Sequence, residues 1–234
     1  MTAKQLTIRL KALGDPTIAA HSQRFFKTGP GEYGEGDRFL GIRVPQLRTA
    51  AKGFRQMPLA DVLLLLASPY HEVRLCALFL LVDKFTRGDD SMRSEIFRSY
   101  LANTRHINNW DLVDSSAPQI VGGYLETRDQ APLYQLATSS SLWERRIAIM
   151  ASFHFIRQGQ FDLTLTLAEH LLNDPEALIH KAVGWMLREV GNRDGKLERR
   201  FLQRHYLNMP RTMLRYAIEK FPEEERQGYL KSTV

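Results

Sequence analysis

The stretch that decides the fold is Leu178-Ile179-His180-Lys181-Ala182-Val183-Gly184-Trp185-Met186-Leu187-Arg188-Glu189-Val190. Its apolar residues recur at spacings of three and four, which is the pattern of an amphipathic α-helix. The same spacing returns in four other segments, which are Leu59–Ala67, Val73–Phe85, Leu142–Ile156 and Leu163–Leu172. Runs that alternate polar and β-branched residues do not occur. The sequence therefore predicts an all-α protein with about a dozen helices joined by short turns.

Proline marks where these helices begin. Its fixed φ suits a first helical turn, and its missing N–H prevents a preceding helix from continuing through it. Six dipeptides are expected to mark such boundaries: Asp15-Pro16, Val44-Pro45, Met57-Pro58, Ser68-Pro69, Asp174-Pro175 and Met209-Pro210.

A basic residue recurs early in the second helix of successive helical pairs. It stands at Arg74, Arg146, Lys181 and Arg215, each time followed by two apolar or small residues. The last two gaps are 35 and 34 residues, and the first gap, 72, is about two such units, so the missing member is expected near residue 110. Helical pairs at this spacing resemble HEAT-type repeats, which stack into a solenoid. We therefore expect one domain, residues 1–234, built as a right-handed superhelix of antiparallel helical pairs.

Equivalent positions in stacked repeats line one surface. The four basic residues are accordingly expected to form a basic stripe that acidic residues interrupt near its middle. The alternative is that each of them caps a helix or forms an ion pair between repeats. Four residues in register favour the stripe.

Charge is unevenly distributed along the 234 residues, whose net charge is +6. Residues 1–57 carry ten Lys/Arg against four Asp/Glu, residues 58–180 carry ten against fifteen, and residues 181–234 carry twelve against seven. Two basic ends around an acidic middle could hold a polyanion while leaving a carboxylate near its centre. No apolar run is long enough to span a bilayer, and no secretory signal is recognisable, so we predict a soluble cytoplasmic protein without a membrane partner.

The single cysteine, Cys76, has apolar neighbours and is expected to be an inert core residue. A glycine-rich segment, residues 29–37, is expected to be a flexible connection. It lacks the Lys-Ser/Thr ending of a phosphate-binding loop, which argues against nucleotide binding by this segment. A lid over bound DNA is the other interpretation of this segment.

The segment Trp110-Asp111-Leu112-Val113-Asp114 carries the chemistry. A tryptophan and a carboxylate four residues apart share one face of a helix. Further along, Trp143 precedes Arg146, and Lys181 precedes Trp185. An aromatic ring, a carboxylate and an arginine that converge can hold a cation, stabilise a developing cation and bind a phosphate. This combination suggests chemistry on positively charged, damaged DNA bases.

The sequence resembles the AlkD-type DNA alkylation-repair glycosylases over most of its length. The similarity rests on four segments: Phe39-Leu40-Gly41-Ile42-Arg43-Val44-Pro45, Trp110-Asp111-Leu112-Val113-Asp114, Trp143-Glu144-Arg145-Arg146 and Lys181-Ala182-Val183-Gly184-Trp185-Met186-Leu187-Arg188-Glu189. The second and fourth segments together are fairly specific, whereas either alone is weak.

This resemblance implies hydrolysis of the N-glycosidic bond of N3- and N7-alkylated purines in double-stranded DNA, on an all-helical solenoid and without metal or cofactor. By motif, Asp114 resembles the catalytic carboxylate, Trp110 and Trp185 resemble the paired aromatic residues, and Arg146 resembles the phosphate-contacting base. Five further basic residues are candidate DNA contacts: Arg43, Arg74, Lys181, Arg188 and Arg215. No lysine stands out as a Schiff-base nucleophile, so we expect a monofunctional enzyme, and no obligate protein partner is predicted.

Each assignment has an alternative. Asp114 could cap a break in the helix before Pro118, and Asp111 could be the catalytic group instead. The tryptophans could be packing residues, and this is the favoured interpretation of Trp143. Phe25 stands where some family members have a tyrosine.

Two other functions remain open for the whole chain. The first is a non-catalytic relative that binds DNA structure, and the second is a HEAT-type scaffold that binds peptides. The basic stripe and the central carboxylate favour the glycosylase over the scaffold. The histidines show no zinc-binding spacing, and Ser115 and Ser116 have no histidine at a recognisable spacing for a nucleophilic triad.

Overall fold

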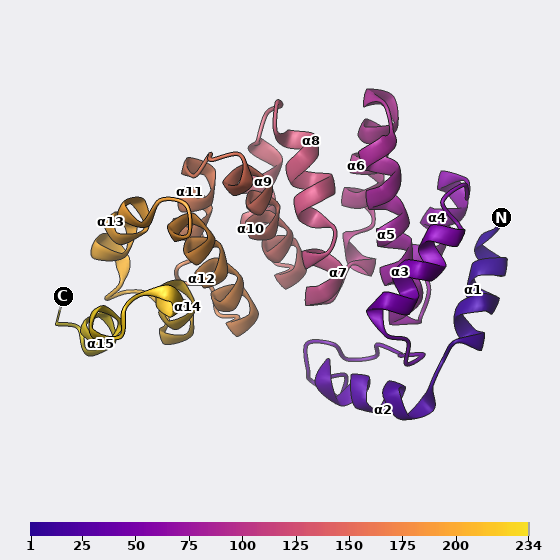
Figure 1. Cartoon of the computed structure of the whole chain (residues 1–234), viewed down its shortest axis with the longest axis horizontal. Coiled ribbons are helices and arrows are strands. Elements are labelled where there is room, and N and C mark those ends of the chain that lie inside the picture. The colour runs from indigo at the N-terminus through magenta and orange to yellow at the C-terminus, as the bar shows by residue number, and fades with distance from the viewer. Residues whose placement is uncertain (234) are drawn as a thin grey trace. The chain divides into compact units, whose positions relative to one another are not determined.

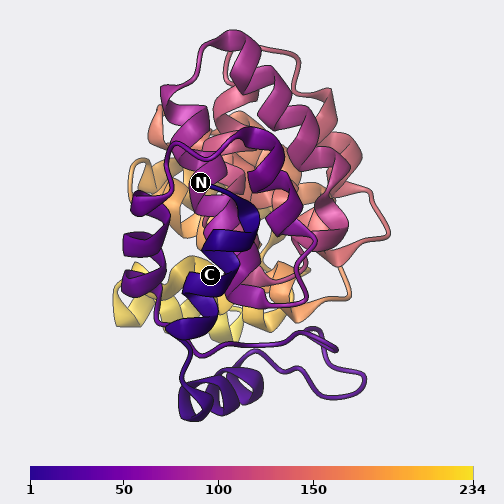
Figure 2. The same cartoon turned by 90° about the vertical axis from the view of Figure 1, so that its right-hand side faces the viewer.

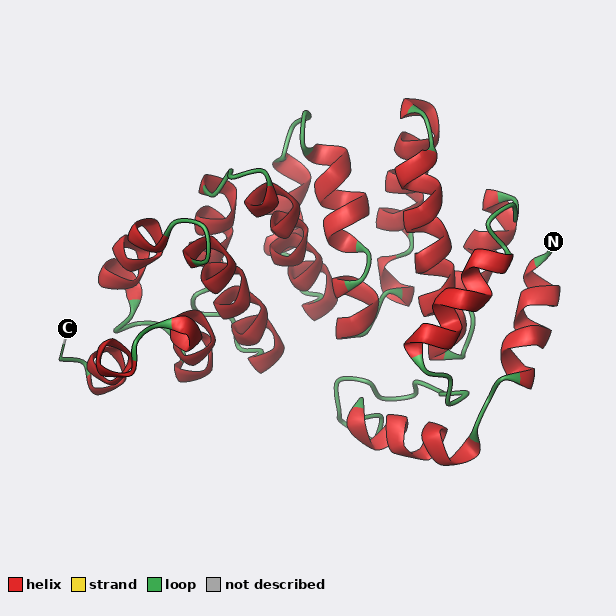
Figure 3. Ribbon diagram, in the orientation of Figure 1, coloured by secondary structure: helices red, strands yellow, loops and turns green. Residues whose placement is uncertain are grey.

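The computed structural model describes residues 1–233, and these residues form helices and connecting loops without a named strand (Figure 3). Extended pairing within this range is limited to an isolated parallel bridge between Arg38 and Tyr70. The predicted all-α class is confirmed. None of the helices in this range is both long and apolar enough to cross a membrane.

The chain forms two compact units, Met1–Ile120 and Val121–Val234 (Figure 1). The helices of the first unit are α1 (Ala3–Ala12), α2 (Pro16–Phe25), α3 (Val44–Gly53), α4 (Leu59–Leu66), α5 (His71–Arg87), α6 (Asp90–Ala102), η1 (Thr104–His106) and α7 (Trp110–Asp114). A π-helical turn, η2 (Pro118–Gly122), contains the boundary between the units. That residues 1–234 fold as a single domain stays a prediction.

The second unit contains α8 (Gly123–Leu125), α9 (Ala131–Ala137), α10 (Leu142–Arg157), α11 (Asp162–His170), α12 (Ala177–Gly191), α13 (Gly195–His205), α14 (Arg211–Ala217), η3 (Ile218–Lys220) and α15 (Glu223–Lys231). The two long helices α10 and α12 pack against each other. In addition α10 contacts α9 and α11, and α12 contacts α11, α13 and α14. Arg146, Lys181 and Arg215 are the fifth residues of α10, α12 and α14, so the predicted periodicity corresponds to the same position along these three helices.

The five segments predicted from apolar spacing correspond to α4, α5, α10, α11 and α12, with ends that differ by no more than two residues. Proline acts as expected at the start of α2. Pro16 is its first residue, and the Asp15 carboxylate accepts hydrogen bonds from the Thr17 and Ile18 N–H groups at 2.8 and 3.1 Å.

The core of the first unit is α5. Its residues from His71 to Leu81 are buried without interruption, because α5 packs against α3, α4, α6 and α7. Cys76 lies in this core and is fully buried, as predicted. Burial raises the pKa of its thiol to about 12, which keeps the thiol protonated and unreactive.

A close approach of α12 to α14 explains why position 184, in the Lys181–Glu189 segment, is a glycine. A Cβ atom on Gly184 would lie 2.4 Å from the Met213 carbonyl oxygen and 2.6 Å from the Tyr216 Cβ atom. Only a residue without a side chain therefore permits this helix crossing.

The segment between α2 and α3 lies along one end of the first unit. Figures 1 and 2 both show α2 and the following loop below the other helices of that unit. The loop returns to α5 at the Arg38–Tyr70 bridge, where the His71 N–H also donates to the Arg38 carbonyl at 2.8 Å. This placement brings the end of the glycine-rich segment beside the start of α5.

Candidate functional site

The Trp110–Asp114 segment forms the whole of α7, with the tryptophan at its first position and the carboxylate at its last. Asn109 caps this helix, and its side-chain oxygen accepts a hydrogen bond from the Trp110 N–H at 2.9 Å. Both Trp110 and Asp114 are partly buried, whereas Leu112 and Val113 between them are buried. The helix therefore turns its apolar side inward and leaves the tryptophan and the final carboxylate at the edge of the unit.

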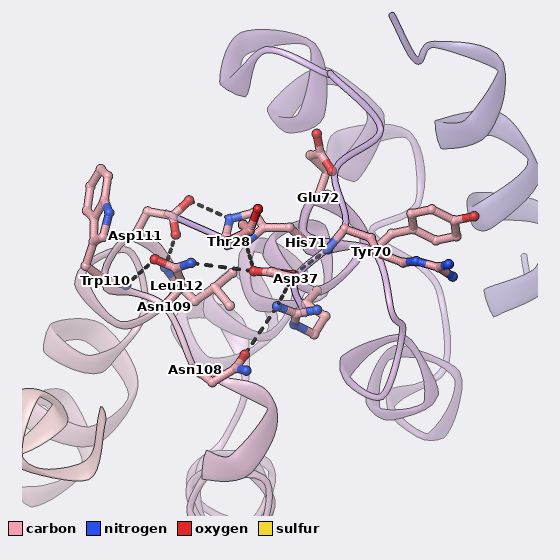
Figure 4. Close-up of polar contacts among 12 residues, drawn as sticks. Thr28, Asp37, Tyr70, His71, Glu72, Asn108, Asn109, Trp110, Asp111 and Leu112 are labelled. Carbon is pink, nitrogen blue, oxygen red and sulfur yellow. Dashed lines mark hydrogen bonds and ion pairs between the residues drawn. The ribbon is translucent and has the colours of Figure 1, made fainter. Parts of the chain in front are cut away.

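Asp111, the remaining acid of the motif, forms an ion pair with His71. The Asp111 Oδ2 atom lies 2.8 Å from the His71 Nε2 atom, and on the other side of the ring the Asp37 Oδ2 atom lies 2.8 Å from Nδ1 (Figure 4). The histidine is buried between two carboxylates that come from different parts of the chain. This contact ties the loop before α3 and the helix α7 to the start of α5.

Arg74 completes this cluster. Its Nη2 atom donates to the Asp37 Oδ1 atom at 2.9 Å and to the Asn108 side-chain oxygen at 3.2 Å, and Nη1 donates to the Ser68 carbonyl at 3.1 Å. Asp37, His71, Asp111 and Arg74 can together carry two negative and two positive charges. A buried charge is tolerated when it is paired in this manner.

The pKa values of the cluster reflect this pairing. Burial alone would lower the pKa of His71, but the charges and hydrogen bonds of Asp111 and Asp37 outweigh burial and raise that pKa to about 9. Burial would raise the pKa of Asp37, but the hydrogen bond and charge of His71, together with Arg74, lower it instead. At neutral pH the histidine is therefore an imidazolium and Asp37 is a carboxylate.

Aromatic rings connect the same cluster to Trp110. The Trp110 ring stacks on Phe26 with centroids 5.3 Å apart, and Phe26 stacks on Phe39 at 4.9 Å. Phe39 in turn stacks on His71 at 4.5 Å. Phe25, which is 58% exposed, meets the Trp110 ring edge-on at 6.1 Å. One face of the indole is thus held in place by the protein.

The Phe39–Pro45 segment is positioned by one buried carboxylate. Glu72 accepts hydrogen bonds from three consecutive N–H groups, those of Leu40, Gly41 and Ile42, at 2.8, 2.7 and 3.2 Å. Gly41 has a φ of +81°, and a Cβ atom there would lie 2.0 Å from the Asp15 carbonyl oxygen. Gly41 and Glu72 therefore set the backbone conformation of the Phe39–Pro45 segment. This conformation places Phe39 against His71 and leaves Arg43 exposed at the start of α3.

The candidate residues of the second unit lie on α10, α12 and α14. Arg146 is 5% exposed, and its Nη1 atom donates to the Leu178 carbonyl at 2.6 Å. Trp185 is partly buried, with its indole N–H donating to the Glu189 carboxylate at 3.3 Å and its ring 6.1 Å from Phe153. The Arg146 guanidinium and the indole N–H of Trp185 therefore both form hydrogen bonds within the protein.

The basic residues differ in what they can offer to a ligand. Lys181 and Arg215 are exposed, while Arg188 forms an ion pair with Glu219. Arg74 is buried within the first unit, where it forms an ion pair with Asp37. The alternative to the basic stripe, an ion-paired role, thus describes Arg74. Arg188, a candidate DNA contact outside the stripe, is also ion-paired, whereas Arg43, Lys181 and Arg215 present side chains to solvent.

The structure brings Trp110, Asp111 and Asp114 together on α7 of the first unit. It places Arg146 and Trp185 in the second unit, on α10 and α12, which pack against each other. Sequence reasoning missed Asp37 and His71. Their spacing of 34 residues carries no local signature, and Asp37 was one of several acids in a segment interpreted as a connection. Within residues 1–233 no group of three or more His, Cys, Asp or Glu side chains is arranged to hold a metal ion.

Two comparisons relate the chain to known proteins, and a third finds no match. A family model described as "DNA alkylation repair enzyme" matches residues 6–221. The chain is also similar to a solved structure titled "Predicted DNA alkylation repair enzyme from Enterococcus faecalis", with a TM-score of 0.69 and 17% sequence identity over 90% of this chain and 97% of that one. No curated protein matches the sequence. At this identity the solved structure shows a shared fold, whereas the family model matches nearly the whole sequence.

Proposed function

The chain belongs to the DNA alkylation repair enzyme family, and from this premise we propose that it is a monofunctional DNA glycosylase. Its substrates are double-stranded DNA containing purines alkylated at N3 or N7. The observation that carries this proposal is the position of Asp114 one helical turn after Trp110 on α7, a short helix whose orientation is fixed by the His71–Asp111 ion pair.

The chemistry of the lesion suits these residues. Alkylation at N3 or N7 gives the purine a positive charge, so the base leaves as a neutral molecule and needs little help from a general acid. The deoxyribose gains oxocarbenium character as the bond breaks, and a carboxylate can stabilise that cation or activate the attacking water. Asp114 takes this role in the proposal, with both possibilities retained. An indole face attracts a cation by roughly 0.5–2 kcal/mol, which gives Trp110 and Trp185 a preference for the charged lesion.

Basic residues bind the DNA backbone in this proposal. In this proposal Arg146 contacts a phosphate, and the exposed Arg43, Lys181 and Arg215 add further phosphate contacts. Arg188 can do so only at the cost of its pair with Glu219. The buried Arg74 acts indirectly, by holding Asp37 against His71.

The decisive experiment incubates the protein with duplex DNA carrying 7-methylguanine and measures the released base. We expect Asp114→Asn to reduce the release rate by about a hundredfold or more while DNA binding is retained. Glu95→Gln removes one exposed carboxylate from α6 in the same unit and is the matched control, which we expect to behave like the wild type. Native release by Asp114→Asn would exclude that residue from catalysis.

The same assay separates the alternative functions. DNA binding without base release by the wild type would support the non-catalytic DNA-binding relative, and the absence of both would leave the peptide-binding scaffold. A monofunctional enzyme leaves an intact strand with an abasic site, so strand breaks should arise only after alkaline heating. Strand breaks without that treatment would contradict the monofunctional assignment.

A further inference from the structure

A cationic cleft lies between α3 and α5, within the first unit and away from α7 in sequence. It encloses about 560 Å³. Its rim carries Arg48 and Lys52 from α3, Arg55 from the turn that follows, and Asp83 and Arg87 from the last part of α5. None of these residues belongs to the site described above.

The rim has more positive than negative charge. Asp83 pairs with both Arg55, at 3.3 Å, and Arg87, so a single carboxylate serves two guanidinium groups. Among the described residues, Arg48 and Lys52 have no carboxylate partner. Four cations and one anion leave an excess of three positive charges around one cavity. Because like charges repel at short range, such a group is stabilised when an anion enters it.

Helix ends account for only part of this excess. Lys52 and Arg87 stand in the last turns of α3 and α5, where cations interact favourably with the helix dipole. Arg48 lies earlier in α3, and Arg55 lies beyond its end. Burial and the nearby Arg87 charge also lower the pKa of the Lys84 ammonium, an effect expected where positive charge is crowded.

The floor of the cleft is apolar. It is formed by Ala51, Phe79, Leu80 and Val82, and the Arg48 guanidinium lies over the Phe79 ring with its carbon 4.2 Å from the ring centroid. A cavity of this volume falls in the range of sites for small organic ligands. An apolar floor below a cationic rim matches a ligand with a flat organic part and an anionic group.

We propose that the α3–α5 cleft binds the phosphate group of an organic anion of nucleotide size, with the organic part of the ligand on the apolar floor. This inference is independent of the glycosylase activity, because it concerns binding at other residues. Two kinds of ligand carry a phosphate group next to a flat organic part: a free nucleotide and a nucleotide unit of a DNA strand. The experiment below distinguishes them.

The test compares two double variants with equal loss of charge. Arg48→Ala/Lys52→Ala removes two cations from the rim, and Lys4→Ala/Arg98→Ala removes two exposed cations elsewhere in the same unit. Calorimetry measures binding of 2′-deoxyguanosine 5′-monophosphate, of the nucleoside without phosphate and of inorganic phosphate. Fluorescence anisotropy measures the affinity for an undamaged duplex over a range of salt concentrations, and circular dichroism checks that each variant is folded.

If the source is a free nucleotide, the wild type binds the monophosphate more tightly than either fragment, and the cleft variant loses about tenfold or more of that affinity while the control does not. If the source is a DNA strand, the cleft variant weakens duplex binding more than the control does. Its log–log salt slope is then lower by about 2, because two phosphate contacts are lost. Equal behaviour of the two folded double variants with every ligand would overturn the proposal.

Discussion

The pairing of His71 with Asp37 and Asp111 makes the stability of the first unit depend on pH in a specific window. The pKa of His71 in the folded protein is raised to about 9, against an ordinary value of 6.5. A group whose folded pKa is raised stabilises the fold fully below its unfolded pKa. That contribution is then lost as the pH rises through the folded pKa, here between 6.5 and about 9.

The size of the effect follows from the shift. One pKa unit corresponds to about 1.4 kcal/mol, so the shift of His71 contributes roughly 3 kcal/mol at low pH. We expect the free-energy difference between the wild type and His71→Gln to shrink by about 3 kcal/mol between pH 6 and pH 9.5, because the imidazolium is then lost from the wild type. Replacing one member of a buried ion pair also costs stability on its own account.

Urea unfolding at each pH measures this difference, and the NMR titration of the histidine rings measures the pKa directly, with His71→Gln identifying the signal. His170→Gln is the matched control, since His170 is exposed at the end of α11 and should change the pH profile little. A constant difference between wild type and His71→Gln over the whole pH range, or a His71 pKa near 6.5, would refute the proposed ion-paired state.

Further predictions concern single contacts. Gly184→Ala should destabilise the protein by about 1–3 kcal/mol, because its Cβ meets the α14 backbone. Gly53→Ala, whose Cβ would have only an arginine nitrogen at 3.8 Å, should be neutral or slightly stabilising in the same urea assay. Glu72→Gln should cost about 1–3 kcal/mol, because one of the two acceptor oxygens becomes an NH2 group that faces at least one of the three N–H donors. Hydrogen exchange at residues 40–42 should accelerate. Cys76 should react with a thiol reagent only after denaturation; fast reaction of the folded protein would contradict its buried position. Affinity for DNA should fall steeply with salt in anisotropy titrations, and an affinity that ignores ionic strength would exclude the phosphate contacts.

The sequence was sufficient for the helices that carry the fold. The apolar spacing located α5, α10 and α12 to within two residues. Each of these helices packs against several others, and the buried side of such a helix requires apolar residues at spacings of three and four. The recurring basic position was also real, in the sense that Arg146 and Lys181 occupy the same place in α10 and α12. What the side chain at that place does could not be inferred from the period.

Arg74 shows why. Its position in the pattern suggested a residue on a basic surface, but the structure surrounds it with Asp37, Asn108 and the Ser68 carbonyl. These partners come from segments between 6 and 37 residues away. Periodicity reports which face of a helix a residue occupies, whereas an ion pair depends on what another segment places opposite that face. Long-range pairing of this kind leaves no local pattern in one sequence.

The sequence predicts part of the arrangement of the Trp110–Asp114 motif on α7 but not the contacts that orient it. A helix of five residues has little stability of its own, so its orientation must come from contacts outside it. Those contacts are the Asn109 cap, the stacking of Trp110 on Phe26, and the pair between Asp111 and His71. The sequence could identify Trp110 as a candidate, but the residues that orient it are distant in the chain.

This arrangement also bears on which acid of the motif acts in catalysis. The Asp111 carboxylate already faces the His71 imidazolium at 2.8 Å, and a carboxylate neutralised by one cation stabilises a second cation poorly. Asp111 is therefore suited to holding α7 in place, and the role beside the sugar cation stays proposed for Asp114, which follows Trp110 by one helical turn. Asp111→Asn should accordingly lower the His71 pKa and loosen α7, with an effect on stability that Asp114→Asn does not share. A loss of stability in Asp114→Asn alone, with base release lost only in Asp111→Asn, would reverse the two assignments.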